Sequence, residues 1–219
     1  MTTTGGQRAP RTPRTSRGAA LAQTRVLAER SRELVTQLRG EIGVPNRPNG
    51  RPALVMLMGF PGTGKTHCAR LLAVRLGAAH VATDHLRSRL FIAPSYAREE
   101  NRVVFRLAEA LVEQLLAEGH VVVLDATNLI ADYRAPMEDV ASRRSVTLLR
   151  VLVVADDAHV RARLAARAVG RANGDHSDAD LGVYERMRAR GFDPPERFVE
   201  LRNGPDVDTE IERIAASLS

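Results

Sequence analysis

One eight-residue stretch constrains the fold of this chain more than any other. Residues 59–66 read Gly-Phe-Pro-Gly-Thr-Gly-Lys-Thr, a complete G-x-x-x-x-G-K-[ST] pattern. The apolar run ALVMLM at 53–58 precedes it and is typical of a strand buried on both faces of a parallel sheet. A helix is expected over 64–77. A strand, a glycine-rich loop and a helix in this order predict a loop whose backbone N–H groups bind phosphate.

Each position of this loop has a chemical reason. Glycines allow backbone conformations closed to other residues and a close approach to the ligand. The ammonium of Lys65 reaches β- and γ-phosphate oxygens, and the hydroxyl of Thr66 is a ligand for Mg²⁺. The residues expected to bind the nucleotide are Gly59, Phe60, Pro61, Gly62, Thr63, Gly64, Lys65, Thr66 and His67.

Lys65 is the only lysine among the 32 basic residues of the chain. A compact ammonium on a slim stem fits inside such a loop, whereas a planar guanidinium would crowd it. A sequence that uses arginine everywhere else would therefore keep lysine here, which indicates a nucleoside triphosphate site. The Asn-Lys-x-Asp motif of GTP-specific switch proteins needs a second lysine, so ATP is the expected nucleotide.

The rest of the chain alternates between expected strands and expected helices, which predicts an α/β fold with a parallel sheet. Buried apolar runs favour strands over 53–58, 79–83, 120–125, 145–154 and 198–203. Helices are expected over 64–77, 95–118, 130–143, 157–168, 178–190 and 207–218.

The positive charge is concentrated before this region. Residues 1–51 hold ten arginines and three glutamates, whereas residues 52–219 carry a net charge of −1. We expect a disordered basic tail over 1–18, an amphipathic helix and linker over 19–52, and one phosphate-loop domain over 53–219. An acid-free, arginine-rich start also resembles an organelle transit peptide, but a tail on a bacterial protein is the preferred interpretation. No apolar run reaches membrane-spanning length, and the lone Cys68, expected to be packing, favours a reducing cytoplasm.

Three charged residues near expected strand ends are candidates for catalysis. Asp84 follows the second strand, where a carboxylate can accept the proton of an attacking hydroxyl. Arg87, one helical turn later, could hold an anionic acceptor or the transferred group. Asp125 ends the strand HVVVLD and is the candidate acid that orients Mg²⁺. A purely structural role is also open: Asp84 and Asp125 could be helix caps, and Arg87 could be exposed to solvent. Thr127 and Asn128 follow at the same edge.

These pieces carry a family resemblance over about 53–203. GFPGTGKT, TDHLR, VVVLDATN, an arginine-bearing helix and GDHSDAD resemble the bacterial P-loop kinases identified as AAA-family ATPases. Those proteins are similar to 5′-hydroxyl polynucleotide kinases, zeta toxins and chloramphenicol phosphotransferase. The resemblance implies Mg²⁺-dependent transfer of the ATP γ-phosphate to a hydroxyl, on a five-stranded parallel sheet of order 2-3-1-4-5. It also implies Asp84 as general base, Arg87 on the acceptor side and Asp125 in the metal site.

A helical lid is expected at about 161–180. Arg163 and Arg167 stand four residues apart on one helix face, and Arg171 follows in the next loop. Arginines closing over the phosphate would stabilise transferred charge and exclude water, and Arg167 is the first choice for that contact. The sequence DHSDAD at 175–180 is interpreted as a capping box from Ser177 to Asp180 and not as a metal cluster.

Three classes of function remain open from the sequence. The leading one is a kinase acting on a small molecule or, through the basic tail, on nucleic acid. The net charge of the domain favours a small acceptor, and neither a membrane nor a protein partner is predicted. The second is an ATP-hydrolysing switch or remodelling ATPase that acts on a protein partner. The third is a nucleotide-binding module without turnover. The acceptor pocket is expected between residues 84–98 and the lid, lined by Phe91, Tyr96 and Arg98.

Overall fold

A computed structural model describes the chain except for residues 1–25, 28, 49–50, 93, 170–178 and 219. The predicted disordered tail over 1–18 and the start of the predicted helix and linker over 19–52 lie outside the described residues. Within the described part, none of the helices is both long enough and apolar enough to cross a membrane.

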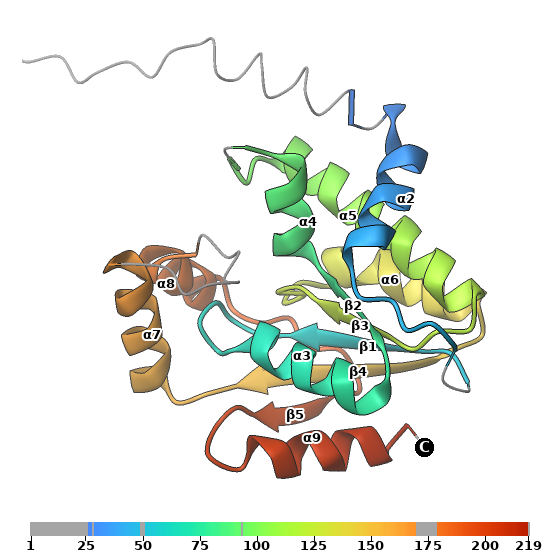
Figure 1. Cartoon of the computed structure of the whole chain (residues 1–219). Helices are drawn as coiled ribbons and strands as arrows, with labels where there is room; N and C mark the ends of the chain where they lie inside the picture. The colour runs from blue at the N-terminus through green and yellow to red at the C-terminus, as the bar shows by residue number, and fades with distance from the viewer. Residues whose placement is uncertain (1–25, 28, 49–50, 93, 170–178, 219) are drawn as a thin grey trace, which may run out of the picture.

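Five parallel strands form one sheet in the order β2-β3-β1-β4-β5 (Figure 1). The predicted order 2-3-1-4-5 is therefore confirmed. The strand that precedes the phosphate loop, β1, lies at the centre of the sheet, with β3 and β4 as its neighbours. The strands are β1 (Ala53–Met58), β2 (Ala79–Ala82), β3 (Val122–Asp125), β4 (Thr147–Val154) and β5 (Val199–Arg202).

The two faces of the sheet have separate hydrophobic cores, and β1 contributes to both. Leu54 and Met56 belong to one core, and Val55 and Leu57 belong to the other, because successive side chains of a strand point to opposite faces. All four side chains are fully buried, which explains why the apolar run is continuous. The first core includes residues of α4 (Thr83–Leu90), α5 (Arg98–Ala117) and α6 (Ala131–Arg143), and the second includes residues of α3 (Lys65–Leu76) and α9 (Val207–Ala216).

The helix before the sheet, α2 (Ser31–Glu41), packs against the first core through contacts with α5. Leu34, Val35 and Leu38 are buried in the same cluster as the apolar face of α5. Arg39 forms an ion pair with Glu118 just after α5, which fixes the helix from a second direction. This segment is thus packed as part of the sheet's core.

The remaining helices, α7 (Asp157–Val169) and α8 (Leu181–Arg190), pack against each other beside the phosphate loop (Figure 1). Val160, Leu164 and Tyr184 form a small core between them. Phe60 of the loop meets the Tyr184 ring edge-on, with ring centroids 6.2 Å apart. The predicted lid segment of about 161–180 includes most of α7, and its Leu164 belongs to the cluster that packs against Phe60 of the loop.

Two local expectations need correction. Predicted strand 79–83 ends at Ala82, because Thr83 begins α4, a helix whose bounds the sequence pattern did not give. Asp180 is itself the N-cap of α8, where its Oδ1 accepts from the Val183 N–H at 2.7 Å. It is therefore not the third residue of a helix capped by Ser177, which lies outside the described residues. An aspartate at this position satisfies an otherwise unpaired N–H, so the helix begins at Leu181.

Candidate active site

The phosphate loop turns sharply between β1 and α3, and glycine makes the turn possible. Gly59, Gly62 and Gly64 have φ angles of 151°, 81° and 89°, a range that residues with a side chain rarely adopt. A Cβ atom at Gly59 would also lie 2.7 Å from the carbonyl oxygen of Val153. The close approach of β4 therefore requires glycine at the first position of the motif.

The Lys65 side chain lies inside the loop. Its Nζ donates to the Phe60 carbonyl at 2.9 Å, and the Thr63 hydroxyl donates to the same oxygen at 2.9 Å. Burial lowers the pKa of Lys65, although the carboxylates of Asp125 and Asp84 oppose the change. A buried ammonium is costly unless an anion faces it, so this arrangement suits a bound phosphate.

Asp125 ends β3 beside the loop and is buried. Burial alone would raise the pKa of Asp125, but His80 and the charge of Lys65 outweigh it and hold that pKa below its ordinary value, with a further hydrogen bond from Thr66. The Nε2 atom of His80, on the neighbouring strand β2, lies 3.4 Å from Asp125 Oδ2. His80 was missed in the sequence analysis, although its place on the strand next to Asp125 could have suggested it.

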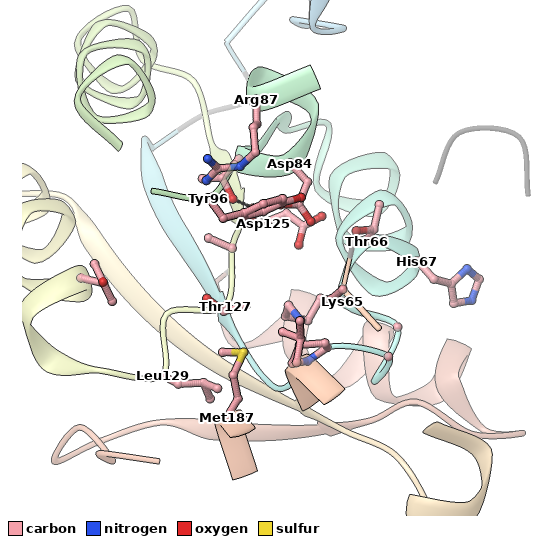
Figure 2. A pocket seen from close by; sticks show the side chains of 18 of the residues that line it. Lys65, Thr66, His67, Asp84, Arg87, Tyr96, Asp125, Thr127, Leu129 and Met187 are labelled. Carbon is pink, nitrogen blue, oxygen red and sulfur yellow. Dashed lines mark hydrogen bonds between the residues drawn. The ribbon is translucent and has the colours of Figure 1, made fainter. Parts of the chain in front are cut away.

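Asp84 and Arg87 both lie on α4, one turn apart, and both line the same cavity as Lys65 and Asp125. Figure 2 shows Asp84, Asp125 and Thr66 grouped together on one side of Lys65, with His67 pointing away from them. The structure thus brings together the predicted base, the predicted metal ligands and the phosphate lysine. Carboxylate and hydroxyl oxygens are the donors that Mg²⁺ prefers, so the side chains of Thr66 and Asp125 fit that ion.

Arg87 is not exposed to solvent, so the purely structural alternative for this residue is wrong on that point. Its side chain is buried, forms an ion pair with Glu100 and donates to Asn101 Oδ1 at 2.8 Å. The Tyr96 ring lies over the guanidinium, 4.4 Å from ring centroid to Cζ. Burial alone would raise the pKa of Glu100, but hydrogen bonds from Ser95 and Arg87 outweigh it and lower that pKa. The role of Arg87 toward an acceptor stays a prediction.

Asn203, which the sequence analysis left without a role, holds the loop from the other side. It follows β5, and its Nδ2 donates to the Thr63 carbonyl at 2.8 Å. A Cβ atom at Gly64 would collide with this amide, so the two residues are fitted to each other. Its position at the end of a parallel strand, beside the other polar residues of this edge, was the available signal.

The two lid arginines lie near the loop, on α7. Arg163 Nη1 is 3.5 Å from the Gly62 carbonyl, and Arg167 Nη1 donates to the Ala179 carbonyl at 3.2 Å. Both line the cavity. Arg171 and residues 175–178 of the DHSDAD segment lie outside the described residues. Among the described residues, no group of three or more His, Cys, Asp or Glu side chains could hold a metal ion.

The two polar residues that follow β3, Thr127 and Asn128, support the phosphate loop and the central strand. Asn128 is fully buried with φ 46°, and its Nδ2 donates to the Leu57 carbonyl at 2.8 Å, so it ties the turn after β3 to β1. The Thr127 carbonyl accepts from the Gly59 N–H at 3.0 Å and supports the loop. Cys68 is buried in the core, as the packing interpretation predicts, and burial raises the pKa of its thiol to about 12.

The cavity has a volume of about 1340 Å³ and two sides of different character. We call the first the loop side; it is formed by the phosphate loop, α3, α7, Asp125 at the end of β3 and the turn over 203–207. We call the second the aromatic side; it is formed by α4, residues 94–105 and residues 126–133, with Met187 of α8. Tyr96 lines the aromatic side as predicted, but Phe91 is buried in the core and Arg98 is not among the lining residues. Drug-sized ligands occupy roughly 300–1,000 Å³, so this volume suits more than one substrate.

Three solved structures share the fold at low sequence identity. The APS kinase CysC of Mycobacterium tuberculosis, solved with AMPPNP and APS, is 20% identical with a TM-score of 0.57, over 77% of this chain and 97% of that one. Kti12 of Chaetomium thermophilum, solved with ADP-AlF3, is 19% identical with a TM-score of 0.61, over 76% and 99%. A gluconokinase of Sinorhizobium meliloti is 18% identical with a TM-score of 0.51, over 79% and 97%. The fold is that of the P-loop kinases.

The chain also matches part of a longer mycobacterial protein and one family model. Uncharacterized protein Rv2004c of Mycobacterium tuberculosis is 29% identical over 152 residues, which are 64% of this chain and 30% of that protein. The chain therefore matches about a third of the length of its curated relatives. The family model AAA_33, described as an AAA domain, matches residues 54–195, from the central strand to beyond α8. This protein belongs to the AAA_33 family of AAA domains.

Proposed function

We propose that the protein is an ATP-dependent kinase that transfers the γ-phosphate of ATP to a hydroxyl of an acceptor. The observation that carries this proposal is the meeting of Lys65, Asp84 and Asp125 in one cavity large enough for two substrates. Nucleotides in two of the structurally similar proteins, AMPPNP and ADP-AlF3, support ATP as the donor.

The loop side would bind the nucleotide. The N–H groups of the loop and the buried ammonium of Lys65 would face the phosphates, and the N-terminus of α3 would add partial positive charge. Thr66 and Asp125 would hold Mg²⁺. When bound, the ion would neutralise charge that develops on the phosphate oxygens.

Asp84 would act as the general base. The acceptor hydroxyl gives its proton to the Asp84 carboxylate as its oxygen bonds to the γ-phosphorus, and the bond from that phosphorus to the β-bridging oxygen breaks to leave ADP. Such a base contributes roughly 10²–10⁴-fold to a rate. Asp84 lines the same cavity as Lys65 but lies on α4 and not in the phosphate loop, so the transferred phosphate would pass between the two side chains.

Arg163 and Arg167 would complete the site from α7. Arginines beside a transferring phosphate stabilise its charge and add most where water is excluded. Arg163 already lies against the Gly62 carbonyl, and Arg167 approaches from the next helical turn. We propose that α7 and α8 act as the lid.

The test follows the γ-phosphate. Purified protein with Mg²⁺ and ATP is incubated alone and with pooled hydroxyl compounds, and labelled phosphate is traced by mass. Transfer to an acceptor, lost in Asp84→Asn, would establish the kinase. Release of free phosphate that Asp84→Asn does not diminish, and that a protein partner stimulates, would replace the proposal with an ATP-hydrolysing switch.

A further inference from the structure

We propose that the aromatic side of the cavity binds an uncharged alcohol that carries a planar aromatic ring. The ring would lie against Tyr96, Phe105 and Tyr133, and its hydroxyl would point at Asp84. This inference rests on the proposed kinase function and names the class of its acceptor.

The first argument is where the rings are. The chain has five phenylalanines, three tyrosines and no tryptophan. Three of these eight rings line the aromatic side, which is a large share for a protein with so few aromatic residues. Phe105 and Tyr133 are stacked with centroids 5.5 Å apart and planes 15° from parallel, and Tyr133 is 42% exposed. Exposed, stacked rings present a flat apolar surface to a ligand.

The second argument is that this surface is linked to the base through α4 and the contacts of Arg87. Asp84 and Arg87 share α4, and the Tyr96 ring lies over Arg87. Asn101 also contacts Arg87, and Phe105 follows one turn later on α5. Because Asp84 and the three rings line one cavity, an acceptor that covers the rings would have its reacting end on the Asp84 side.

The third argument is the state of the charges there. The guanidinium of Arg87 is paired with Glu100, hydrogen-bonded to Asn101 and covered by Tyr96. An anionic acceptor would have to break this buried pair to use Arg87, and would also face the carboxylate of Asp84. An uncharged acceptor needs neither change, because the cation–π contact already uses the positive charge.

The fourth argument is the backbone at Tyr96. Its φ is 55°, a conformation uncommon for a residue with a side chain. Glu100 accepts from the N–H groups of Ser95 at 2.7 Å and Tyr96 at 3.2 Å, which holds the turn in place. A strained residue that its surroundings fix in one orientation is typical of a ligand site.

Arg186 and Arg190 of α8 also line the cavity and define the competing outcome. An anionic acceptor would be recognised there. Both side chains are exposed and lie on α8, whereas Asp84 lies on α4 with the buried Arg87 and the Tyr96 ring that covers it, so the observations favour the aromatic ligand.

The test uses naphthylethanol as the probe and the full chain. Naphthalene fluorescence can be followed without tryptophan emission from the protein. We expect naphthylethanol to bind more tightly than naphthylacetate, which has the same ring and a carboxylate. Tyr133→Leu and Tyr96→Leu should each weaken the affinity roughly 2- to 12-fold, the effect of one aromatic pair. Tyr96→Phe keeps the ring and should bind as the wild type does.

The outcomes separate this inference from the kinase proposal. Binding that weakens in the leucine variants, with label from ATP found on naphthylethanol, supports both. The same binding pattern with no transfer to any alcohol supports the aromatic site and overturns the kinase proposal. Tighter binding of naphthylacetate, lost in Arg186→Ala with Arg190→Ala and unaffected by Tyr133→Leu, overturns the aromatic acceptor. Absence of naphthylethanol binding by the wild type overturns it as well.

Discussion

The loop side of the cavity is formed mainly by backbone groups, whereas the aromatic side is formed mainly by side chains. The loop side depends on the backbone: glycines with positive φ, a helix N-terminus, and the Asn203 amide that holds the Thr63 carbonyl. The aromatic side depends on side chains: a buried ion pair, a cation–π contact and two stacked rings. Backbone groups suit a ligand part that does not vary, such as a triphosphate, whereas side chains can change with the acceptor.

The two sides also differ in how their buried charges are compensated. Lys65 and Asp125 on the loop side are buried charges that a bound nucleotide and Mg²⁺ would complete. Arg87 and Glu100 on the aromatic side are buried charges that complete each other. Variants of these charged groups on the loop side should therefore affect mainly turnover, and a variant that breaks the Arg87 pair should affect mainly stability.

The largest expected effect is that of Asp84→Asn, on α4 of the aromatic side. The amide keeps the shape of the carboxylate but cannot accept the acceptor's proton, so kcat for phosphate transfer should fall by about 10²–10⁴-fold. ATP binding should change little. The measurement is single-turnover transfer of labelled phosphate, with Asp132→Asn at an exposed position of α6 as the control. Transfer within tenfold of the wild type would remove Asp84 from the mechanism.

On the aromatic side, Glu100→Ala should destabilise the fold by about 3–5 kcal/mol, because it leaves Arg87 buried without its partner. Glu99→Ala, at the exposed neighbouring position, should change the free energy of unfolding by less than about 0.5 kcal/mol. Urea unfolding of both variants gives the comparison. Equal stability of the two would show that the ion pair does not hold this side together.

The same pair predicts a dependence on pH. The folded state lowers the pKa of Glu100, so its contribution to stability is present above the ordinary glutamate pKa of about 4.3 and is lost as pH falls through the lower folded value. The difference in unfolding free energy between wild type and Glu100→Ala should therefore shrink below about pH 4.3. A difference that stays constant down to pH 3 would contradict this.

The loop side was largely predictable from the sequence, and the aromatic side was not. The pattern over 59–66 fixed the strand, the loop and the start of α3, because glycine, lysine and threonine are required there by local backbone and phosphate chemistry. The fold order 2-3-1-4-5 came from the family resemblance, and Asp84 and Asp125 were found from their place at strand ends. Asn203 was missed because its bond to Thr63 joins residues far apart in the sequence.

The misassigned residues of the aromatic side show the limit of local patterns. Phe91 and Tyr96 lie in the same connection after α4, yet Phe91 is 6% exposed in the core and Tyr96 is 39% exposed in the cavity. Which ring faces the cavity is set by the Glu100 hydrogen bonds and the positive φ at Tyr96, neither of which leaves a sequence signal. Phe105 and Tyr133 meet only because α5 and α6 pack side by side.

On the loop side, Lys65→Met and Lys65→Arg should both reduce kcat/KM for ATP by about 10²–10³-fold, the loss typical of one preorganised charged donor. Methionine removes the charge, and arginine keeps it on a group too wide for the space against the Phe60 carbonyl. Steady-state ATP turnover measures both. Retention of more than a tenth of wild-type kcat/KM by Lys65→Arg would show that the loop accepts a guanidinium and that the single lysine has another explanation.

The smallest effect is expected for Asn203→Ala, which keeps every group that would touch the phosphates. Loss of the Nδ2 bond leaves the buried Thr63 carbonyl without this donor and should cost about 1–3 kcal/mol of stability. Because the loop would lose support and no reacting group, KM for ATP should rise more than kcat falls. Arg202→Ala, at the exposed preceding position, is the matched control for both readouts. If kcat fell in Asn203→Ala while KM stayed unchanged, the amide would have to act on the reacting phosphate directly, and the loop side would depend on side-chain chemistry as much as the aromatic side does.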